Sequence, residues 1–213
     1  MDEDIQKNVL KTGTTILGIV CKDGVIMAAD RRGSAGNIVL AKNEEKVFPI
    51  NQNIVMAGAG AGAEIQKIPK MLAAELRLKE LRSKSKPSVK QSVNLLSNIR
   101  TSGHTAFLIG GFNEDGSTEL YSTDPIGHIL KVKDYDANFG SGMPFAYGLL
   151  ERQYKEDMTI KEGIELAKEA LKSSTQRDMG SGNGIDVFSI TKKGIKKEVE
   201  EEITPNYKKR DNK

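Results

Sequence analysis

Continuous apolar runs predict the first strands of the chain. Residues 14–32 (TTILGIVCKDGVIMAADRR) contain two such runs, joined by a polar turn at residues 22–24. An Asp-Gly pair between two apolar runs is typical of a tight β-hairpin. Residues 46–58 (KVFPINQNIVMAG) predict a second pair of strands, which turns at residues 51–53.

Four later segments have the apolar periodicity of helices, and they come in two adjacent pairs. The first covers about residues 64–83 and carries a single apolar stripe. Pro69 lies inside this segment, so the helix either starts there or kinks there. Pro87 opens the second helix. The other pair follows residue 142, and its later helix begins at Thr159, which has a glutamate three residues on, as in a capping box.

The remaining apolar segments predict strands between and after the helix pairs. The order is therefore strands, two helices, strands, two helices, strands. Single helices between successive strands are typical of parallel sheets, so this order argues against them. It favours two antiparallel sheets, covered by helix pairs, within one domain. These further strands are expected near residues 104–111, 119–121, 129–132, 184–190 and 195–199.

Composition is that of an ordinary globular protein. The 213 residues are 38% hydrophobic and 29% charged, and a net charge of +3 is too small to indicate nucleic-acid binding. The single cysteine, Cys21, excludes an internal disulfide framework and is expected to be a buried structural thiol. No apolar run approaches the roughly 18–20 residues that span a bilayer, and residues 1–13 lack the apolar core of a signal peptide. We therefore expect an intracellular, cytoplasmic protein.

A glycine-rich turn at residues 58–63 (GAGAGA) formally matches a dinucleotide-binding fingerprint, with Glu80 as its distal acid. That fingerprint needs a parallel strand after its helix, whereas a second helix is predicted here. Two other interpretations stay open. The turn either joins a strand tightly to a helix, or presents a backbone surface that a substrate or an oxyanion approaches closely.

Thr14 follows Gly13 at the end of a polar leader that has no other evident role. A hydroxyl is a poor nucleophile without a base, and the chain offers no convincing histidine-based triad. A threonine that cleavage makes N-terminal carries its own base, because an α-amino group has a pKa of about 7.7–8.0. A Gly-Thr pair alone is not evidence of an N-terminal nucleophile, so the case for one depends on the surrounding residues.

Those residues resemble the β subunits of the 20S proteasome, of archaeal type, in the N-terminal-nucleophile hydrolase superfamily. The resemblance covers about residues 12–199. It implies an α+β fold, a four-layer αββα sandwich. It also implies that residues 1–13 are a propeptide removed by autocleavage, and that residues 14–213 form a single domain with a charged C-terminal tail. The stretches that carry it, in the family's order and spacing, are TGTTILGIVCKDGVIMAADRR, KNEEK, AGAG, LIGGFNEDG, LYSTDPIG, GSG, YGLLERQY and RDMGSGNGID.

The resemblance also implies the catalytic residues. Thr14 Oγ is the expected nucleophile, both for cleavage of the Gly13–Thr14 bond and for hydrolysis of substrates. Lys46 matches the family's catalytic lysine, whose ammonium favours the deprotonated hydroxyl and the neutral amine, and Asp30 matches the acid that pairs with it. The backbone N–H of Gly60 is expected to face the oxyanion. The network around the threonine amine is expected from Ser141, Asp178 and Ser181.

Small residues are expected to line the substrate cleft, where an extended peptide can pair with the main chain. Among β subunits the sequence looks most similar to the trypsin-like ones: Gly58 leaves the specificity pocket deep, and Glu64 and Glu44 supply acids. This favours cleavage after Lys or Arg. Trypsin-like subunits carry acids at two positions that are Ala41 and Gln66 here, which weakens that preference. The expected lining residues are Gly33, Ser34, Gly58, Gly60 and Gly62.

The partners that the resemblance implies are other β subunits in heptameric rings, α subunits, unfolded polypeptide, and an ATP-dependent unfoldase acting through the α ring. It implies no metal, organic cofactor, nucleic acid or membrane. One alternative is an assembled but unprocessed β subunit, structural or conditionally active, which the complete catalytic set disfavours. Another is the simpler bacterial dodecameric relative, which the LYSTDPIG stretch and the C-terminal tail disfavour.

Overall fold

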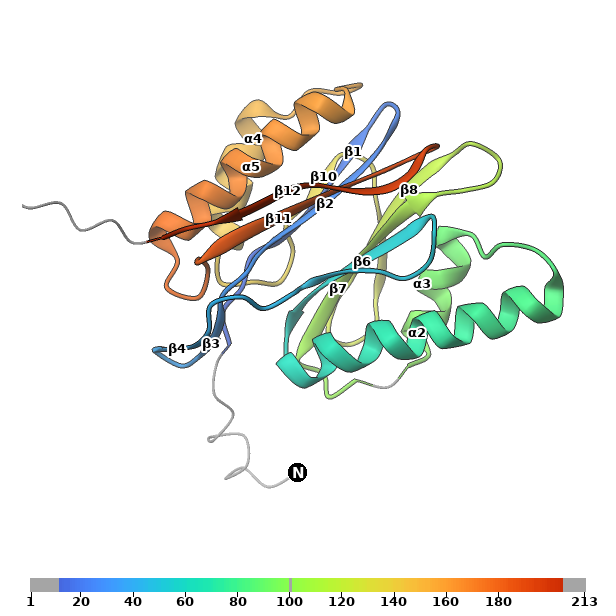
Figure 1. The fold of residues 1–213 in the computed structure, drawn as a ribbon, viewed down its shortest axis with the longest axis horizontal. Coiled ribbons are helices and arrows are strands. Elements are labelled where there is room, and N and C mark those ends of the chain that lie inside the picture. The colour runs from blue at the N-terminus through green and yellow to red at the C-terminus, as the bar shows by residue number, and fades with distance from the viewer. Residues whose placement is uncertain (1–11, 100, 205–213) are drawn as a thin grey trace, which may run out of the picture.

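Two five-stranded antiparallel sheets lie face to face, and a pair of helices covers the outer side of each (Figure 1). The computed structural model describes residues 12–99 and 101–204. This arrangement of layers confirms the predicted αββα sandwich. The propeptide expected at residues 1–13 lies mostly outside the described residues, as does the end of the charged tail.

The first sheet has the strand order β10-β1-β2-β11-β12, and all its pairings are antiparallel. Helices α4 and α5 pack on its outer face. Its strands are β1 (Ile16–Cys21), β2 (Gly24–Asp30), β10 (Tyr135–Asp136), β11 (Gly184–Thr191) and β12 (Gly194–Glu202), and the helices are α4 (Met143–Gln153) and α5 (Ile160–Arg177).

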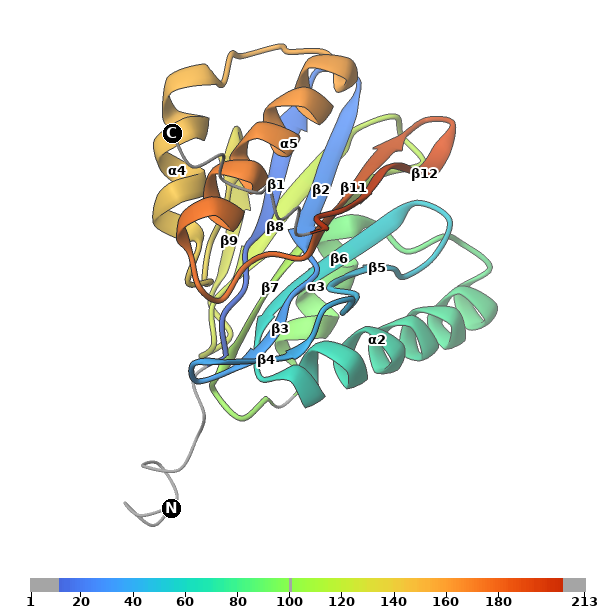
Figure 2. The same ribbon diagram turned by 60° about the vertical axis from the view of Figure 1, so that its left-hand side comes forward.

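The second sheet has the order β5-β6-β7-β8-β9, again antiparallel throughout. Helices α2 and α3 pack on its outer face. A separate two-stranded sheet, β3 with β4, stands beside its end (Figure 2). The elements are β5 (Val47–Pro49), β6 (Ile54–Gly60), β7 (Thr105–Phe112), β8 (Thr118–Thr123), β9 (Ile129–Val132), α2 (Gly62–Ser83), α3 (Val89–Ser97), β3 (Gly33–Ala35) and β4 (Ile38–Ala41).

Strand β2 shows how the sequence pattern builds the layers. All seven of its residues are buried, because it lies in the middle of its sheet with packing on both faces. Successive side chains of a strand point to opposite faces. Ile26 and Ala28 therefore contact the helix layer, whereas Val25, Met27 and Ala29 contact the second sheet. A continuous apolar run is thus what this strand requires.

Helix α2 runs through Pro69 from Gly62 to Ser83, so a start at Pro69 is wrong. Proline lacks the N–H that would bond to the carbonyl four residues earlier, and it normally breaks a helix. Here Ile65, Ile68 and Leu72 are buried on the same side as Pro69, and their packing against the sheet offsets that loss. Tertiary packing therefore decides the course of this helix.

Local capping signals fix the starts of two other helices. The Thr159 hydroxyl accepts from the Glu162 N–H at 3.3 Å, and the Glu162 carboxylate accepts from the Thr159 N–H at 2.8 Å, which confirms the predicted capping box. The Thr159 N–H, and after it the Thr159 hydroxyl, donate to the Glu162 carboxylate and lower its pKa. A second capping box, between Ser88 and Gln91, starts α3 just after Pro87.

Two features of the strands differ from the sequence prediction. The short strands β3, β4 and β10 were not predicted; Ile38 and Leu40 in β4 are exposed, so no buried alternation marked it. Strand β12 extends to Glu202 instead of ending near residue 199. Several of its charged residues form ion pairs. Lys197, for example, lies 3.0 Å from Asp186 of β11 and 3.1 Å from Glu200.

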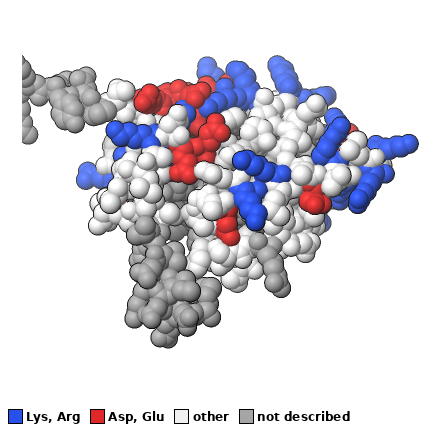
Figure 3. Space-filling model, turned by 60° about the horizontal axis from the view of Figure 1, so that its bottom comes forward, with Lys and Arg blue, Asp and Glu red and all other residues white. Residues whose placement is uncertain are grey.

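Cys21 is buried at 3% exposure, as predicted. Burial, followed by the nearby carboxylates of Asp23 and Glu162, raises the pKa of its thiol to about 12. The thiol is therefore a protonated part of the helix-facing core. None of the described helices has the length and hydropathy to cross a membrane. On the face shown in Figure 3, acidic groups lie between separate groups of basic side chains.

Candidate active site

A cleft of about 660 Å³ opens where β1 begins and β6 ends, with the β3–β4 sheet along one wall. Residues at the start of α2 line another side of the cleft. Figure 2 shows this end of α2 next to the β3–β4 sheet. The cleft brings together segments that are distant in the sequence. Of the residues predicted for the site, those that line it are Gly13, Thr14, Gly33, Ser34, Glu44, Lys46, Gly60 and Gly62.

Thr14 lies two residues before the start of β1 and is only 5% exposed. Its N–H donates to Ser141 Oγ at 3.1 Å, and its carbonyl accepts from the Gly142 N–H at 3.2 Å. A Cβ on Gly140 would lie 2.3 Å from the Thr14 carbonyl oxygen. The glycines of the GSG turn thus allow the loop before α4 to lie directly on the Thr14 backbone.

Asp30 and Lys46 form a buried ion pair, with Lys46 Nζ 2.7 Å from Asp30 Oδ1. Their side chains are 0% and 2% exposed, respectively. Asp30 also accepts backbone N–H groups from Thr15, at 2.8 Å, and from Arg32 and Gly182, at 2.9 and 3.0 Å. These donors satisfy both carboxylate oxygens, and the carboxylate pairs with the buried ammonium.

Lys46 therefore brings a buried positive charge to the cleft that Thr14 also lines. It lies just before β5, and Asp30 ends β2, so the two sheets each contribute one partner of the pair. A fixed ammonium beside a hydroxyl favours the deprotonated form of that hydroxyl. This is the electrostatic condition that an alkoxide nucleophile needs.

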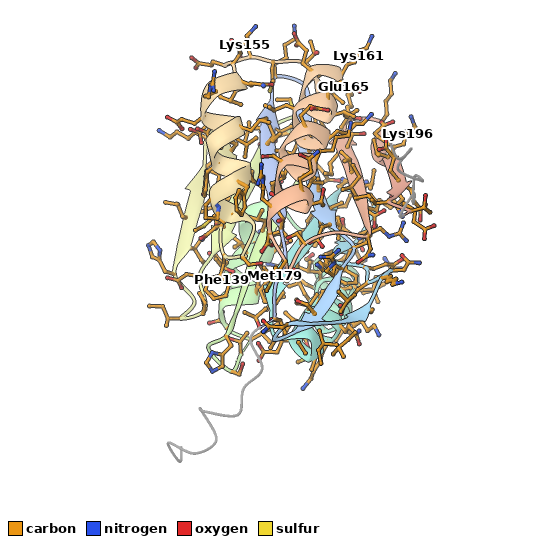
Figure 4. The ribbon with its side chains drawn as sticks, turned by 90° about the vertical axis from the view of Figure 1, so that its left-hand side faces the viewer. Phe139, Lys155, Lys161, Glu165, Met179 and Lys196 are labelled. Carbon is orange, nitrogen blue, oxygen red and sulfur yellow. The ribbon has the colours of Figure 1, made fainter. Side chains whose placement is uncertain are left out.

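Ser141, Asp178 and Ser181 are brought together on the other side of Thr14. Asp178 Oδ2 accepts from Ser141 Oγ at 2.6 Å and from Ser181 Oγ at 2.5 Å. Asp178 follows the end of α5, and Ser141 precedes α4, so the packing of these two helices sets the distance between them. Phe139 and Met179, labelled in Figure 4, mark the two loops involved.

Gly60 ends β6 with φ of +129°, a conformation that favours glycine. A Cβ there would lie 2.0 Å from the His104 carbonyl oxygen, so no side chain fits. The residues before Thr14 contact both walls of the cleft. The Thr12 hydroxyl donates to the Gly60 carbonyl at 2.7 Å, and the Gly13 N–H donates to Ser34 Oγ at 2.9 Å.

Two of the residues predicted to contact substrate, Gly58 and Glu64, are not among those that line the cleft. The Glu64 carboxylate accepts from the Ser102 N–H and from the Thr105 hydroxyl, each at 2.5 Å, so it is bound within the fold. A Cβ on Gly58 would lie 2.9 Å from the Phe107 ring. Glu44 does line the cleft, next to Gly33, where a Cβ would lie 2.2 Å from the Glu44 carboxylate.

The structure adds two residues that sequence reasoning missed. Arg32 donates to the Met179 carbonyl and to Asn183 Oδ1, each at 2.8 Å, and so ties the end of β2 to the loop that carries Asp178. Thr15 contacts both Asp30 and Ser181. Both are neighbours of predicted site residues, which was the only signal in the sequence.

The dinucleotide-binding interpretation of residues 58–63 is wrong. The strand after α2 and α3 is β7, and it pairs antiparallel with β6. A dinucleotide site needs a parallel strand at that place. Within residues 12–99 and 101–204, no three His, Cys, Asp or Glu side chains gather closely enough to hold a metal ion.

Comparison with known proteins gives a consistent result. A family model described as "Proteasome subunit" matches residues 10–190. "Proteasome subunit beta" of Methanocaldococcus vulcanius is 42% identical over 197 residues, which cover 90% of this chain and 88% of that protein. The corresponding protein of Nanoarchaeum equitans is 43% identical, covering 86% of this chain and 96% of its own. "Proteasome subunit beta 2" of Pyrococcus abyssi is 44% identical, and the match covers 86% of this chain and 89% of that protein. With a family match over most of its length and such relatives, the chain belongs to the proteasome subunit family, as a β subunit.

Proposed function

We propose that this β subunit is a threonine endopeptidase of the 20S core particle and degrades unfolded proteins to peptides. The observation that carries the proposal is the buried Asp30–Lys46 pair in the cleft that Thr14 lines. A buried ion pair is weak evidence for stability, because desolvation offsets its attraction. A buried ammonium beside a hydroxyl is instead what a threonine nucleophile requires.

The chemistry proceeds in two halves. Thr14 Oγ attacks the substrate carbonyl, and the Gly60 N–H stabilises the oxyanion of the tetrahedral intermediate. The amine of Thr14 takes the hydroxyl proton and passes it to the leaving nitrogen, which leaves an acyl ester on Thr14. Water, activated by the same amine, then releases the acyl group. Lys46 favours the alkoxide, while Ser141 and Asp178 hold the amine.

The amine exists only after the Gly13–Thr14 bond is cut, which would leave a mature chain of 200 residues, 213 minus 13. We propose that Thr14 cuts this bond itself. The contacts of Thr12 with Gly60 and of Gly13 with Ser34 support this, because they hold the end of the leader in the cleft. On this proposal, the bond to be cut is anchored on its leader side during the attack.

As a member of its family, the chain assembles with other proteasome subunits. We further propose the specific partners: β subunits in heptameric rings, α-subunit rings on either side, an ATP-dependent unfoldase acting through the α ring, and unfolded polypeptide as substrate. We propose that the particle acts in the cytoplasm.

The intact mass of the subunit, assembled with its α and β partners, tests the function, together with peptidase activity. A mass equal to residues 14–213, with activity that the Thr14→Ala variant lacks, supports the proposal. A full-length mass in an inactive assembled particle would overturn it and favour an unprocessed, structural β subunit. The same assay, run with peptides that end in Arg, Leu or Glu, tests the preference for basic residues, for which Glu44 is the supporting acid in the cleft.

We expect Ser34→Ala to slow removal of the leader about tenfold, because the Gly13 N–H loses its acceptor and the scissile bond is less firmly held. Pulse-chase electrophoresis of full-length and processed chains measures the rate. Ser117→Ala serves as the control, since Ser117 is exposed and bonded only within its own turn. Unchanged processing in Ser34→Ala would show that this hydrogen bond does not position the leader.

A further inference from the structure

Thr15, the residue after the proposed nucleophile, is fully buried and contacts both halves of the site. Its N–H donates to Asp30 Oδ1 at 2.8 Å, and its carbonyl accepts from the Asp30 N–H at 3.0 Å. Its hydroxyl contacts a different group, Ser181 Oγ, at 2.7 Å. The backbone of Thr15 thus belongs to the Asp30–Lys46 side of the site, and its side chain belongs to the Asp178 side.

The direction of the Thr15–Ser181 hydrogen bond follows from Asp178. An ionised carboxylate can only accept hydrogen bonds, so Ser141 and Ser181 both direct their protons to Asp178. The Ser181 oxygen is then left to accept, and Thr15 must donate. By the same reasoning, Ser141 accepts from the Thr14 nitrogen. A single chain of hydrogen bonds therefore runs from Thr15 through Ser181, Asp178 and Ser141 to the nitrogen of the proposed nucleophile.

Gly142 shows that the fold reserves space for this hydroxyl. A Cβ on Gly142 would lie 1.8 Å from Thr15 Oγ1 and 3.0 Å from Ser181 Oγ. Its φ of −84° is available to any residue, so space rather than conformation requires a glycine. The turn that carries Ser141 thus packs against the bond between Thr15 and Ser181.

We propose that Thr15 is a positioning residue for peptide hydrolysis, whose hydroxyl acts through Ser181 and Asp178 on the nitrogen of Thr14. The inference rests on the proposed function and adds to it a residue outside the set that the sequence predicted. Removing the hydroxyl leaves the buried Ser181 oxygen without a donor. Hydrogen bonds in a chain strengthen one another, so the bond from Ser181 to Asp178 weakens as well.

This loss has a consequence for proton transfer. A carboxylate with weaker hydrogen bonds attracts a neighbouring ammonium more strongly, so the Thr14 amine would keep its proton to a higher pH. The other charged groups that line the cleft with Thr14 are Arg32, Glu44, Glu45, Lys46 and Lys70, and Asp30 bonds to the Thr15 backbone. Removing the Thr15 hydroxyl removes none of the hydrogen bonds that Asp30 accepts. The acid limb of the kcat/KM profile should therefore move to higher pH.

The test uses the assembled particle, with activity normalised to the processed subunit by intact mass. In Thr15→Val, which keeps the shape and the backbone bonds, we expect kcat to fall about tenfold with KM unchanged. The acid limb of the kcat/KM profile should move to higher pH. Thr15→Ser should recover the wild-type kcat and acid limb, because it restores the hydroxyl that donates to Ser181. A merely structural role would lower the thermal stability of the particle without moving the acid limb.

A double-mutant cycle with Ser181→Ala decides whether Thr15 acts through Ser181. We expect Thr15→Val to have no further effect in the Ser181→Ala background. Additive losses, or wild-type kcat and pH profile in Thr15→Val alone, would overturn the proposal. If Thr15→Val does not assemble, the same cycle with Thr15→Ala gives the answer. Wild-type particles without Thr14-dependent activity would instead refute the proposed function, which keeps the two failures distinct.

Discussion

In the Lys46→Ala variant we expect the Gly13–Thr14 bond to remain intact and peptidase activity to fall to background. Lys46 supplies the buried ammonium of the cleft, and among the described residues its one ion-pair partner is Asp30. Without it, the Thr14 hydroxyl loses the buried positive charge that favours its alkoxide. Because the same hydroxyl attacks both the leader and the substrates, both reactions should fail together.

The variant should also be less stable. Its Asp30 carboxylate, at 0% side-chain exposure, would be left charged without its ammonium, and breaking a buried pair typically costs about 3–5 kcal/mol. Three backbone N–H donors remain on Asp30, so we expect the lower end of that range. Intact mass, peptidase activity and denaturant unfolding measure the three effects. Lys42→Ala is the matched control, as it removes the same charge from an exposed residue nearby. Normal processing with full activity in Lys46→Ala would contradict the mechanism.

Among glycine-to-alanine substitutions in the cleft, we expect Gly60→Ala to lower the free energy of unfolding the most. The added Cβ would lie 2.0 Å from the His104 carbonyl oxygen and 2.7 Å from Thr105 Cα, and both contacts are with backbone. The residue would also keep φ near +129°, which is strained for alanine. Steric overlap and strain together should cost on the order of 4 kcal/mol.

Unfolding by denaturant, and the yield of assembled particles, would measure this loss. Gly62→Ala is the control, because its Cβ would come no closer than 3.8 Å, to Glu44 Oε1, and the residue begins α2. We expect the control to change stability by less than about 1 kcal/mol. If Gly60→Ala folded as stably as the control, the β6–β7 junction would have to be looser than the structure shows.

The predictable part of the fold is the part that local rules determine. The hairpin of β1 and β2, the buried alternation along β2 and the capping box at Thr159 each follow from neighbouring residues. The sequence could not show that α2 continues through Pro69, because packing of its buried face against the sheet decides this. Nor did it predict β4, whose apolar residues are exposed.

The candidate site likewise has a part that the sequence predicts and a part that only the structure shows. The resemblance in sequence motifs led to Thr14, Asp30, Lys46 and the Asp178 network, and the structure brings these residues together. The motifs could not reveal the bond of Thr15 to Ser181, which joins residues 166 positions apart. Nor could they show that the Glu64 carboxylate, expected at the cleft, bonds to Ser102 and Thr105 within the fold. Which way a side chain turns depends on partners that are distant in the sequence.

The contacts of Thr12 and Gly13 also bear on when the enzyme becomes able to cut other proteins. A segment joined covalently to its own cleft competes with free peptides at an effective concentration on the order of millimolar. Even the two hydrogen bonds to Gly60 and Ser34 should therefore keep the cleft filled before cleavage. Cutting the Gly13–Thr14 bond removes this advantage at once, because the freed leader diffuses away. Newly made chains would thus be inert toward one another, and activity would begin with a single irreversible step.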